Sequence, residues 1–115
     1  MSARTTISTH VLDTAMGKPA AGVMVTLFGG PGGTGKTIAS QVTDADGRVT
    51  AFGGDVALEG GSYCLTFDVA GYFATTQRRA FYRTIRIDFE VGVEPQHYHV
   101  PLLLSPFGYS TYRGS

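Results

Sequence analysis

The sequence contains a single cysteine, which excludes an internal disulfide as a means of stabilising the fold. Cys64 has no partner within the 115 residues, and it alternates with apolar neighbours in a strand-like run. That setting favours a buried, unreactive thiol over a catalytic one. The hydrophobic core must therefore supply the stability, and the length is typical of one compact domain, expected to span residues 1–115.

An excess of either charge and a long apolar run are also missing. Nine basic residues balance nine acidic ones, so no net field attracts nucleic acid or an anionic membrane. Apolar residues make up 43% of the chain, too many for disorder, yet no run approaches the roughly 18 residues of a membrane span. The first residues lack the features of a secretory signal. We expect a cytoplasmic protein with a small-molecule or protein partner, and neither a nucleic-acid nor a membrane partner.

Alternation of apolar and polar residues is the strongest pattern present. It is clearest in residues 84–91 and 62–69, and an alternating run is typical of a strand with one face in water. Turn-forming glycine, proline and aspartate residues separate these runs from further candidates. The spacing predicts a β-sandwich or barrel with one short helix at residues 69–78. The further strands are expected at residues 7–13, 22–28, 37–43, 48–52, 97–105 and 109–113.

Pro101 lies inside one of these expected strands. Proline has no N–H to donate to a neighbouring strand, so the pattern predicts an edge position or a bulge. Alternation also places His97 and His99 on the same face as Pro101, opposite an apolar face. This strand combines a packing face with a face suited to chemistry.

A nucleotide-binding motif is present by pattern but is rejected on context. Residues 30–37 satisfy G-x-x-x-x-G-K-[ST], whose backbone amides and lysine bind phosphates when a helix begins at the lysine. The residues that follow, Thr37-Ile38-Ala39-Ser40-Gln41-Val42, are polar and β-branched and predict a strand. The segment is therefore interpreted as a glycine-rich hairpin connection.

The candidates for chemistry are the three histidines and one arginine. On its own, each histidine is more often a surface or satisfied interior residue than a catalytic group. However, His10 shares a strand face with Ser8, and His97 and His99 share a face of another strand. Arg48 follows the Asp46-Gly47 turn, where a solvated arginine is the ordinary interpretation. The residues alone thus predict a β-sandwich with a candidate histidine and arginine site.

The last residues are unusually rich in aromatic side chains. Most chain ends fray, but Phe107, Tyr109 and Tyr112 continue the aromatic content almost to Ser115. We therefore expect the end of the chain to pack against the domain.

Four segments in order carry a family resemblance along nearly the whole chain. They are ISTHVLDTAMGKPAAGVMVTL, TDADGRV, YFATT and HYHVPLLLSPFGYSTYRGS. Together they resemble the 5-hydroxyisourate hydrolases of the transthyretin-like family. The ending Tyr-Arg-Gly-Ser is the feature that separates these enzymes from the hormone-carrying transthyretins. The glycine-rich connection at residues 29–35 departs from the family pattern, away from these motifs.

The resemblance implies a fold, an assembly and a set of site residues. The fold is an all-β, transthyretin-like sandwich of two sheets, with about eight strands and one short helix. The assembly is a homotetramer, a dimer of dimers with its sites at the subunit interface in a central channel. The implied catalytic residues are His10, Arg48 and His99, and the implied substrate-binding residues are His97, Tyr112, Arg113, Gly114 and Ser115.

The implied activity is hydrolysis of 5-hydroxyisourate to 2-oxo-4-hydroxy-4-carboxy-5-ureidoimidazoline in urate breakdown. A neutral imidazole can accept a proton from water and return it to the departing nitrogen. A guanidinium keeps its charge and can hold the substrate's oxygens. We expect no cofactor and no metal, since the histidine spacing is not that of a metal site. The alternatives are a non-enzymatic carrier of a small aromatic ligand and an immunoglobulin-like adhesion module.

Overall fold

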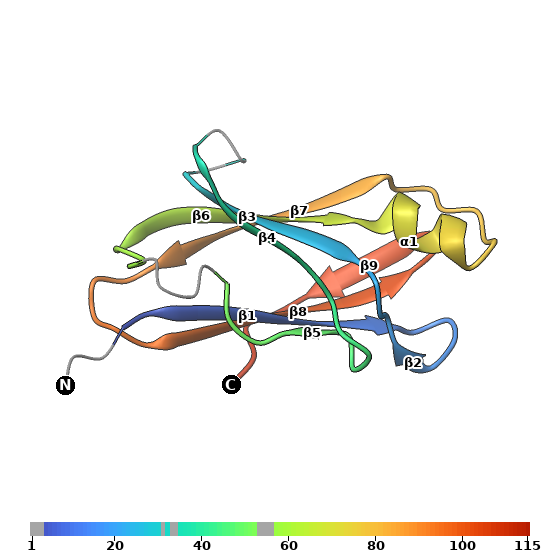
Figure 1. Cartoon of the computed structure of the whole chain (residues 1–115), viewed down its shortest axis with the longest axis horizontal. Helices are drawn as coiled ribbons and strands as arrows, with labels where there is room; N and C mark the ends of the chain where they lie inside the picture. Colours follow the sequence, from blue (N-terminus) through green and yellow to red (C-terminus); the bar gives the residue numbers. More distant parts are fainter. Residues whose placement is uncertain (1–3, 31, 33–34, 53–56) are drawn as a thin grey trace.

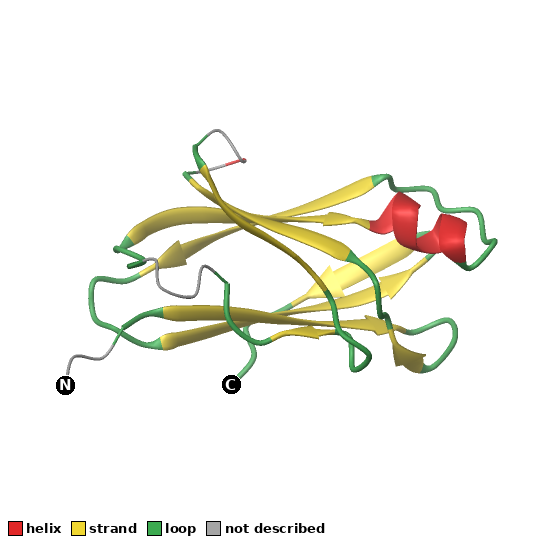
Figure 2. Ribbon diagram, viewed as in Figure 1, coloured by secondary structure: helices red, strands yellow, loops and turns green. Residues whose placement is uncertain are grey.

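Two β-sheets stacked face to face make up the molecule, with one helix at one end (Figures 1 and 2). The computed structural model describes residues 4–30, 32, 35–52 and 57–115. The first sheet has the order β2 (Lys18–Pro19), β1 (Thr6–Asp13), β8 (His97–Ser105) and β9 (Gly108–Thr111), and β5 (Arg48–Val49) also pairs with β1. The second has the order β4 (Thr37–Val42), β3 (Met24–Gly29), β6 (Gly61–Asp68) and β7 (Thr84–Val91). The helix α1 spans Val69–Thr75.

The alternating pattern of the sequence becomes the core between these sheets. Ile7 and Val11 of β1 face Leu27 of β3 and Leu65 and Phe67 of β6 across the interior, and all are fully buried. Each such side chain contributes roughly 1.5–3 kcal/mol by leaving water. The predicted all-β sandwich with one short helix is confirmed.

Helix α1 is shorter than the predicted residues 69–78. Asp68 caps its first turn by accepting a hydrogen bond from the Gly71 N–H at 3.0 Å. Gln77 has a positive φ of 57°, which turns the chain out of the helix. The turn brings the Arg78 guanidinium back over the Phe73 ring, 4.9 Å from its centre, and into an ion pair with Asp13 of β1. This ion pair ties the helix to the opposite sheet.

The predicted strands 84–91 and 97–105 coincide with β7 and β8, and other boundaries differ by a few residues. The expected strand at residues 48–52 forms a ladder only over Arg48–Val49, although the Phe52 N–H also donates to the Ile7 carbonyl of β1 at 2.9 Å. The short strand β2 lies between two of the expected strands, where Gly17 adopts a positive φ of 67° and returns the chain antiparallel to β1.

The predicted edge position of Pro101 is wrong. Strand β8 has β1 on one side, in parallel register, and β9 on the other. The missing N–H is accommodated by a gap in the β8–β9 ladder, which is continuous from Leu102 to Ser105 and resumes only as an isolated bridge between His99 and Gly114. The Thr111 hydroxyl donates to the Pro101 carbonyl across this gap, at 2.7 Å.

The glycine-rich connection joins two antiparallel strands, as predicted. Lys36 accepts a hydrogen bond from the Gly29 N–H at 3.0 Å, and strand β4 begins at Thr37. Residues 31, 33 and 34 of the motif lie outside the described residues. A strand thus stands where phosphate binding would need a helix.

Across the described ranges, no helix is long and apolar enough to cross a membrane.

Candidate active site

Strand pairing in the first sheet brings the predicted catalytic residues together. Ser8 of β1 is opposite His99 of β8 in the parallel register, and His10 of β1 is opposite Arg48 of β5. Side chains point to the same side of a sheet when their residues are paired on neighbouring strands. The same holds for residues two apart on one strand. The outer face of the first sheet therefore carries these side chains together with His97.

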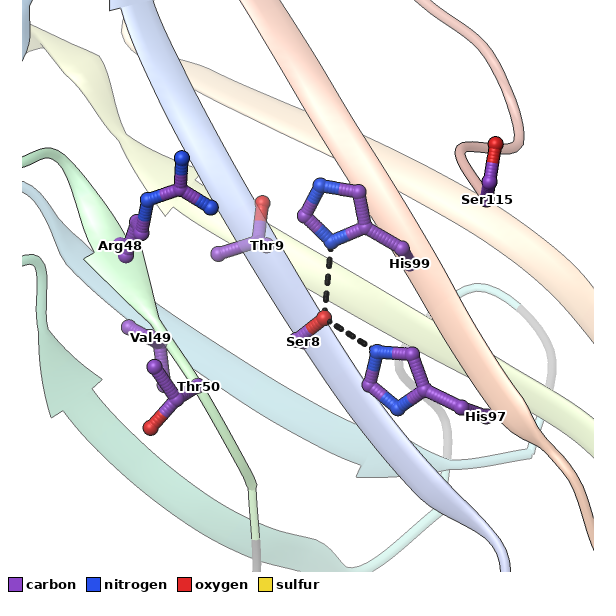
Figure 3. Close-up of a pocket in the computed structure, with 8 residues that line it drawn as sticks. All are labelled: Ser8, Thr9, Arg48, Val49, Thr50, His97, His99 and Ser115. Atoms are coloured by element: carbon purple, nitrogen blue, oxygen red, sulfur yellow. Dashed lines mark hydrogen bonds between the residues drawn. The ribbon is translucent and has the colours of Figure 1, made fainter.

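These residues surround a pocket of about 250 Å³ on that face. Figure 3 shows the imidazoles of His97 and His99 extending toward Ser8, with Arg48 on one side of His99 and Ser115 on the other. The lining residues are Ser8, Thr9, Arg48, Val49, Thr50, His97, His99 and Ser115. They come from the beginning, middle and end of the chain, so only folding brings them together.

A line of hydrogen bonds connects the two imidazoles. The Ser8 Oγ lies 2.9 Å from the His97 Nε2 and 2.8 Å from the His99 Nδ1 (Figure 3). The other nitrogen of His97, Nδ1, is 2.5 Å from the Thr6 Oγ1. The two rings are nearly parallel, at 17°, with their centres 6.4 Å apart. Ser8 therefore holds both rings in fixed orientations.

The surroundings of His99 favour its neutral form. Burial lowers the pKa of His99 below its usual 6.5, and positive charge on His97, His10 and Arg48 lowers this pKa further. A histidine with such a pKa is uncharged at neutral pH. It has a bare ring nitrogen available to accept a proton.

The end of the chain packs against this site, but through its backbone and not through the aromatic side chains that led to the expectation, since Phe107, Tyr109 and Tyr112 are exposed. The Gly114 N–H donates to the His99 carbonyl at 2.8 Å, which brings the two backbones together. A side chain at position 114 would place its Cβ 2.5 Å from the His99 Cδ2. Glycine is therefore required here by the close approach of the His99 ring.

Arg113 faces away from the pocket and fastens the tail. Its guanidinium donates to the Gln96 Oε1 at 2.8 Å and lies 4.6 Å from the centre of the Tyr98 ring. Tyr112 and Arg113 line a different pocket of about 160 Å³, with Ile87 and Phe89 of β7.

The predicted site residues thus fall into three groups within the described part of the chain. His97, His99, Arg48 and Ser115 line one pocket, whereas Tyr112 and Arg113 line the other. His10 and Gly114 line neither pocket, but the charge of His10 acts on His99 and the Gly114 N–H donates to the His99 carbonyl.

The sequence pattern placed Ser8 on the face of His10 but did not assign it to the site, and it did not single out Thr6. Thr6, Ser8 and His10 are two residues apart along β1 and so share one face, which is the signal that could have found both. Thr9 and Thr50 also line the pocket, and nothing in their local pattern distinguishes them from ordinary strand residues.

Metal binding has little support in this arrangement. Among residues that the structure describes, no group of three or more His, Cys, Asp or Glu side chains is placed to hold a metal ion. The hydrogen bonds to Thr6 and Ser8 occupy three of the four ring nitrogens of His97 and His99. The metal-free and cofactor-free site stays a prediction.

Comparison with known proteins decides the family. The model of the HIUase/Transthyretin family matches residues 7–114, nearly the whole length. The chain belongs to this family. Among curated relatives, the 5-hydroxyisourate hydrolase of Deinococcus radiodurans is 46% identical, with all of both chains covered.

Solved structures of the family share the fold. The 5-hydroxyisourate hydrolase of Klebsiella pneumoniae is 43% identical and superposes with a TM-score of 0.85, covering 96% of this chain and 99% of its own. Sea bream transthyretin, solved in complex with thyroxine, is 28% identical with a TM-score of 0.82, covering 94% and 93%. The HIUase/Transthyretin fold thus supports proteins with different roles, and the site residues must distinguish between them.

Proposed function

We propose that this chain hydrolyses 5-hydroxyisourate to 2-oxo-4-hydroxy-4-carboxy-5-ureidoimidazoline, as a cyclic amide hydrolase of urate breakdown. The observation that carries the proposal is the convergence of His99, Arg48 and Ser115 on one pocket. Relatives that cover nearly the whole chain and are named 5-hydroxyisourate hydrolases support it.

The roles follow from the chemistry of the groups. The neutral imidazole of His99 accepts a proton from the attacking water and later donates one to the departing ring nitrogen. Arg48 stabilises the oxyanion that develops on the substrate carbonyl, because its charge is permanent and its planar fork donates two parallel hydrogen bonds. His10, whose charge acts on His99, is the second proton-transfer candidate. Ser115 and His97 line the same pocket and are assigned to substrate binding.

A carrier of a small aromatic ligand is the second candidate, because transthyretin with bound thyroxine has the same fold. Sites that bind aromatic ligands are lined mainly by apolar and aromatic side chains. The pocket described above is instead lined by two imidazoles, a guanidinium and four hydroxyl groups. This composition favours the hydrolase.

The assembly and the setting are part of the same proposal. We infer a cytoplasmic homotetramer, a dimer of dimers with its sites at the subunit interface, acting in purine catabolism. Strands β7 and β9 are each the last strand of their sheet, and two such edges are available to pair with another copy. Light scattering after size-exclusion chromatography measures the assembly directly.

The activity is tested with substrate made in the assay by urate oxidase acting on urate. The optical decay of 5-hydroxyisourate is followed with the purified protein and with its variants. His99→Ala should lower kcat/KM by about 10²–10⁴-fold, the usual contribution of a general base. Arg48→Ala should lower it by about 10²-fold or more, because an oxyanion partner is lost.

The matched control is Ser40→Ala in the second sheet, which removes an exposed hydroxyl of β4 that is hydrogen-bonded to Thr26 of the neighbouring strand β3. It should keep the full rate. A wild-type protein that leaves the decay unchanged would refute the proposed function, and full turnover in both site variants would refute the assigned roles.

A further inference from the structure

The hydrogen-bonded line Thr6–His97–Ser8–His99 runs from the pocket to solvent. His99 is half-buried at the pocket, whereas His97 is exposed and its bond to Thr6 lies at the surface. His99 uses Nδ1 to contact Ser8, and Figure 3 shows its other nitrogen, Nε2, on the opposite side of the ring from Ser8. The line therefore begins at a nitrogen free to meet substrate and ends in water.

The line has two complete arrangements of its protons. A serine hydroxyl has one hydrogen, so Ser8 donates to one imidazole and must accept from the other. When Ser8 donates to His97, it accepts from the Nδ1–H of His99, and the Nε2 of His99 is bare. When Ser8 donates to His99, the Nε2 of His99 carries the proton. Reversing every hydrogen bond thus converts His99 from a base into an acid without charging it.

We propose that Ser8 and His97 form a proton relay that lets His99 act in turn as base and acid, with Thr6 as its exit to solvent. The inference rests on the proposed hydrolysis and adds residues that act on the reaction through His99. Ser8 is a positioning residue in this scheme, because its contacts are to the two imidazoles.

The need for a relay follows from the electrostatics of His99. A lone imidazole that accepts a proton becomes a cation, and burial together with the charges of His97, His10 and Arg48 disfavours that cation. If the proton on Nδ1 leaves as another arrives on Nε2, the ring stays neutral. The relay removes the charge that the surroundings of His99 oppose.

The proton steps balance in both halves of the reaction. As the water oxygen bonds to the substrate carbonyl carbon, the water proton passes to the His99 Nε2. The His99 Nδ1 proton passes to Ser8, the Ser8 hydroxyl proton to the His97 Nε2, the His97 Nδ1 proton to Thr6, and the Thr6 hydroxyl proton to solvent.

When the carbon–nitrogen bond then breaks, the departing nitrogen takes the electron pair and the proton on the His99 Nε2. The line refills by one proton from solvent, through Thr6, His97 and Ser8. It returns to its first arrangement with no net gain or loss of protons.

Variants of Ser8, with a control on the other sheet, test the relay first. Ser8→Ala removes the shared hydroxyl, Ser8→Thr keeps a hydroxyl at the same position, and Ser40→Ala is the matched loss of a hydroxyl on the other sheet. We expect Ser8→Ala to lower kcat by about tenfold to a hundredfold, within the contribution of general acid–base catalysis. Ser8→Thr should recover most of the rate, and Ser40→Ala should match wild type.

The number of protons that move in the rate-limiting step separates a relay from a merely structural serine. Rates are measured in mixtures of H₂O and D₂O, where several moving protons give a curved dependence on the deuterium fraction and one proton gives a straight line. Wild type and Ser8→Thr should give curves, and Ser8→Ala a straight line. His97→Gln, at an exposed position where folding is not at risk, should also give a straight line, because an amide cannot accept one proton and release another.

The outcomes distinguish the relay from the hydrolysis on which it rests. Absence of activity in wild type would overturn the proposed function itself. An active wild type whose Ser8→Ala and His97→Gln variants keep both the rate and the curved dependence would overturn the relay alone. A lower rate with an unchanged curve would also overturn it, since Ser8 would then only support the structure.

Discussion

Replacing Gly114 by alanine should disable the site without unfolding the protein. An alanine Cβ at this position would lie 2.5 Å from the Cδ2 of the His99 ring, 3.2 Å from its Cγ and 3.3 Å from the Cγ of Pro101. Ordinary carbon contacts begin at about 3.4 Å, so the ring or the tail must move by about 1 Å. A misplacement of about 1 Å at a reacting group costs about 10²-fold in rate.

The assay compares Gly114→Ala with Gly108→Ala, in the same C-terminal hairpin. A Cβ at position 108 meets only the Ser105 Oγ, at 3.8 Å, which is an ordinary contact. We expect kcat for 5-hydroxyisourate decay to fall by about 10²-fold in Gly114→Ala and to stay near wild type in Gly108→Ala. Melting temperatures should stay within a few degrees of wild type in both. Full activity in Gly114→Ala would show that the close approach to His99 does not hold the imidazole in place.

Further predictions concern stability, pH and the tail. Arg78→Met should lower the free energy of unfolding by about 3 kcal/mol in urea titrations, because the fully buried Asp13 carboxylate loses its cationic partner. Burial raises the pKa of Asp13, but hydrogen bonds from Arg78, Tyr72 and the Met16 N–H, with the charge of Arg78, lower it overall. This stabilisation is therefore full above the ordinary carboxyl pKa near 3.8 and is lost as pH falls below it, so unfolding midpoints should drop toward pH 3 in wild type. In pH–rate profiles, kcat/KM should rise as His99 loses its proton, with a midpoint below pH 6.5, and a midpoint above 6.5 would contradict its lowered pKa. Deleting residues 113–115 should abolish activity, and an active truncated protein would exclude the tail from the site.

The alternation of apolar and polar residues was sufficient to predict the bounds of the strands whose two faces differ most. Residues 84–91 alternate without interruption, and the structure has β7 at those bounds. The prediction of strands failed where strand pairing depends on residues far away in the sequence. Residues 48–52 form a ladder with β1 only at Arg48–Val49, and beyond it the Phe52 N–H alone returns to the Ile7 carbonyl of β1. Pro101 was expected at an edge or a bulge, yet β8 is an interior strand in unbroken register with β1, and the β8–β9 ladder is interrupted instead.

The candidate site shows the same division. Motifs marked His10, Arg48, His99 and the last four residues, but they treated Tyr112 to Ser115 as one unit. The structure divides that unit, since Ser115 lines the histidine pocket while Arg113 turns to Gln96 and Tyr98. Successive residues of an extended chain point to opposite sides, so neighbours in a motif need not share a site.

By itself, the sequence determined which faces of the strands are apolar, that no disulfide closes within the chain, and which side chains are able to exchange protons. Those properties depend on residue types and on a period of two along the backbone. The tertiary structure alone decided that β1 and β8 run in parallel register, which sets Ser8 between His97 and His99. Register is a relation between segments about ninety residues apart, and it is set by how the whole core packs rather than by any local pattern.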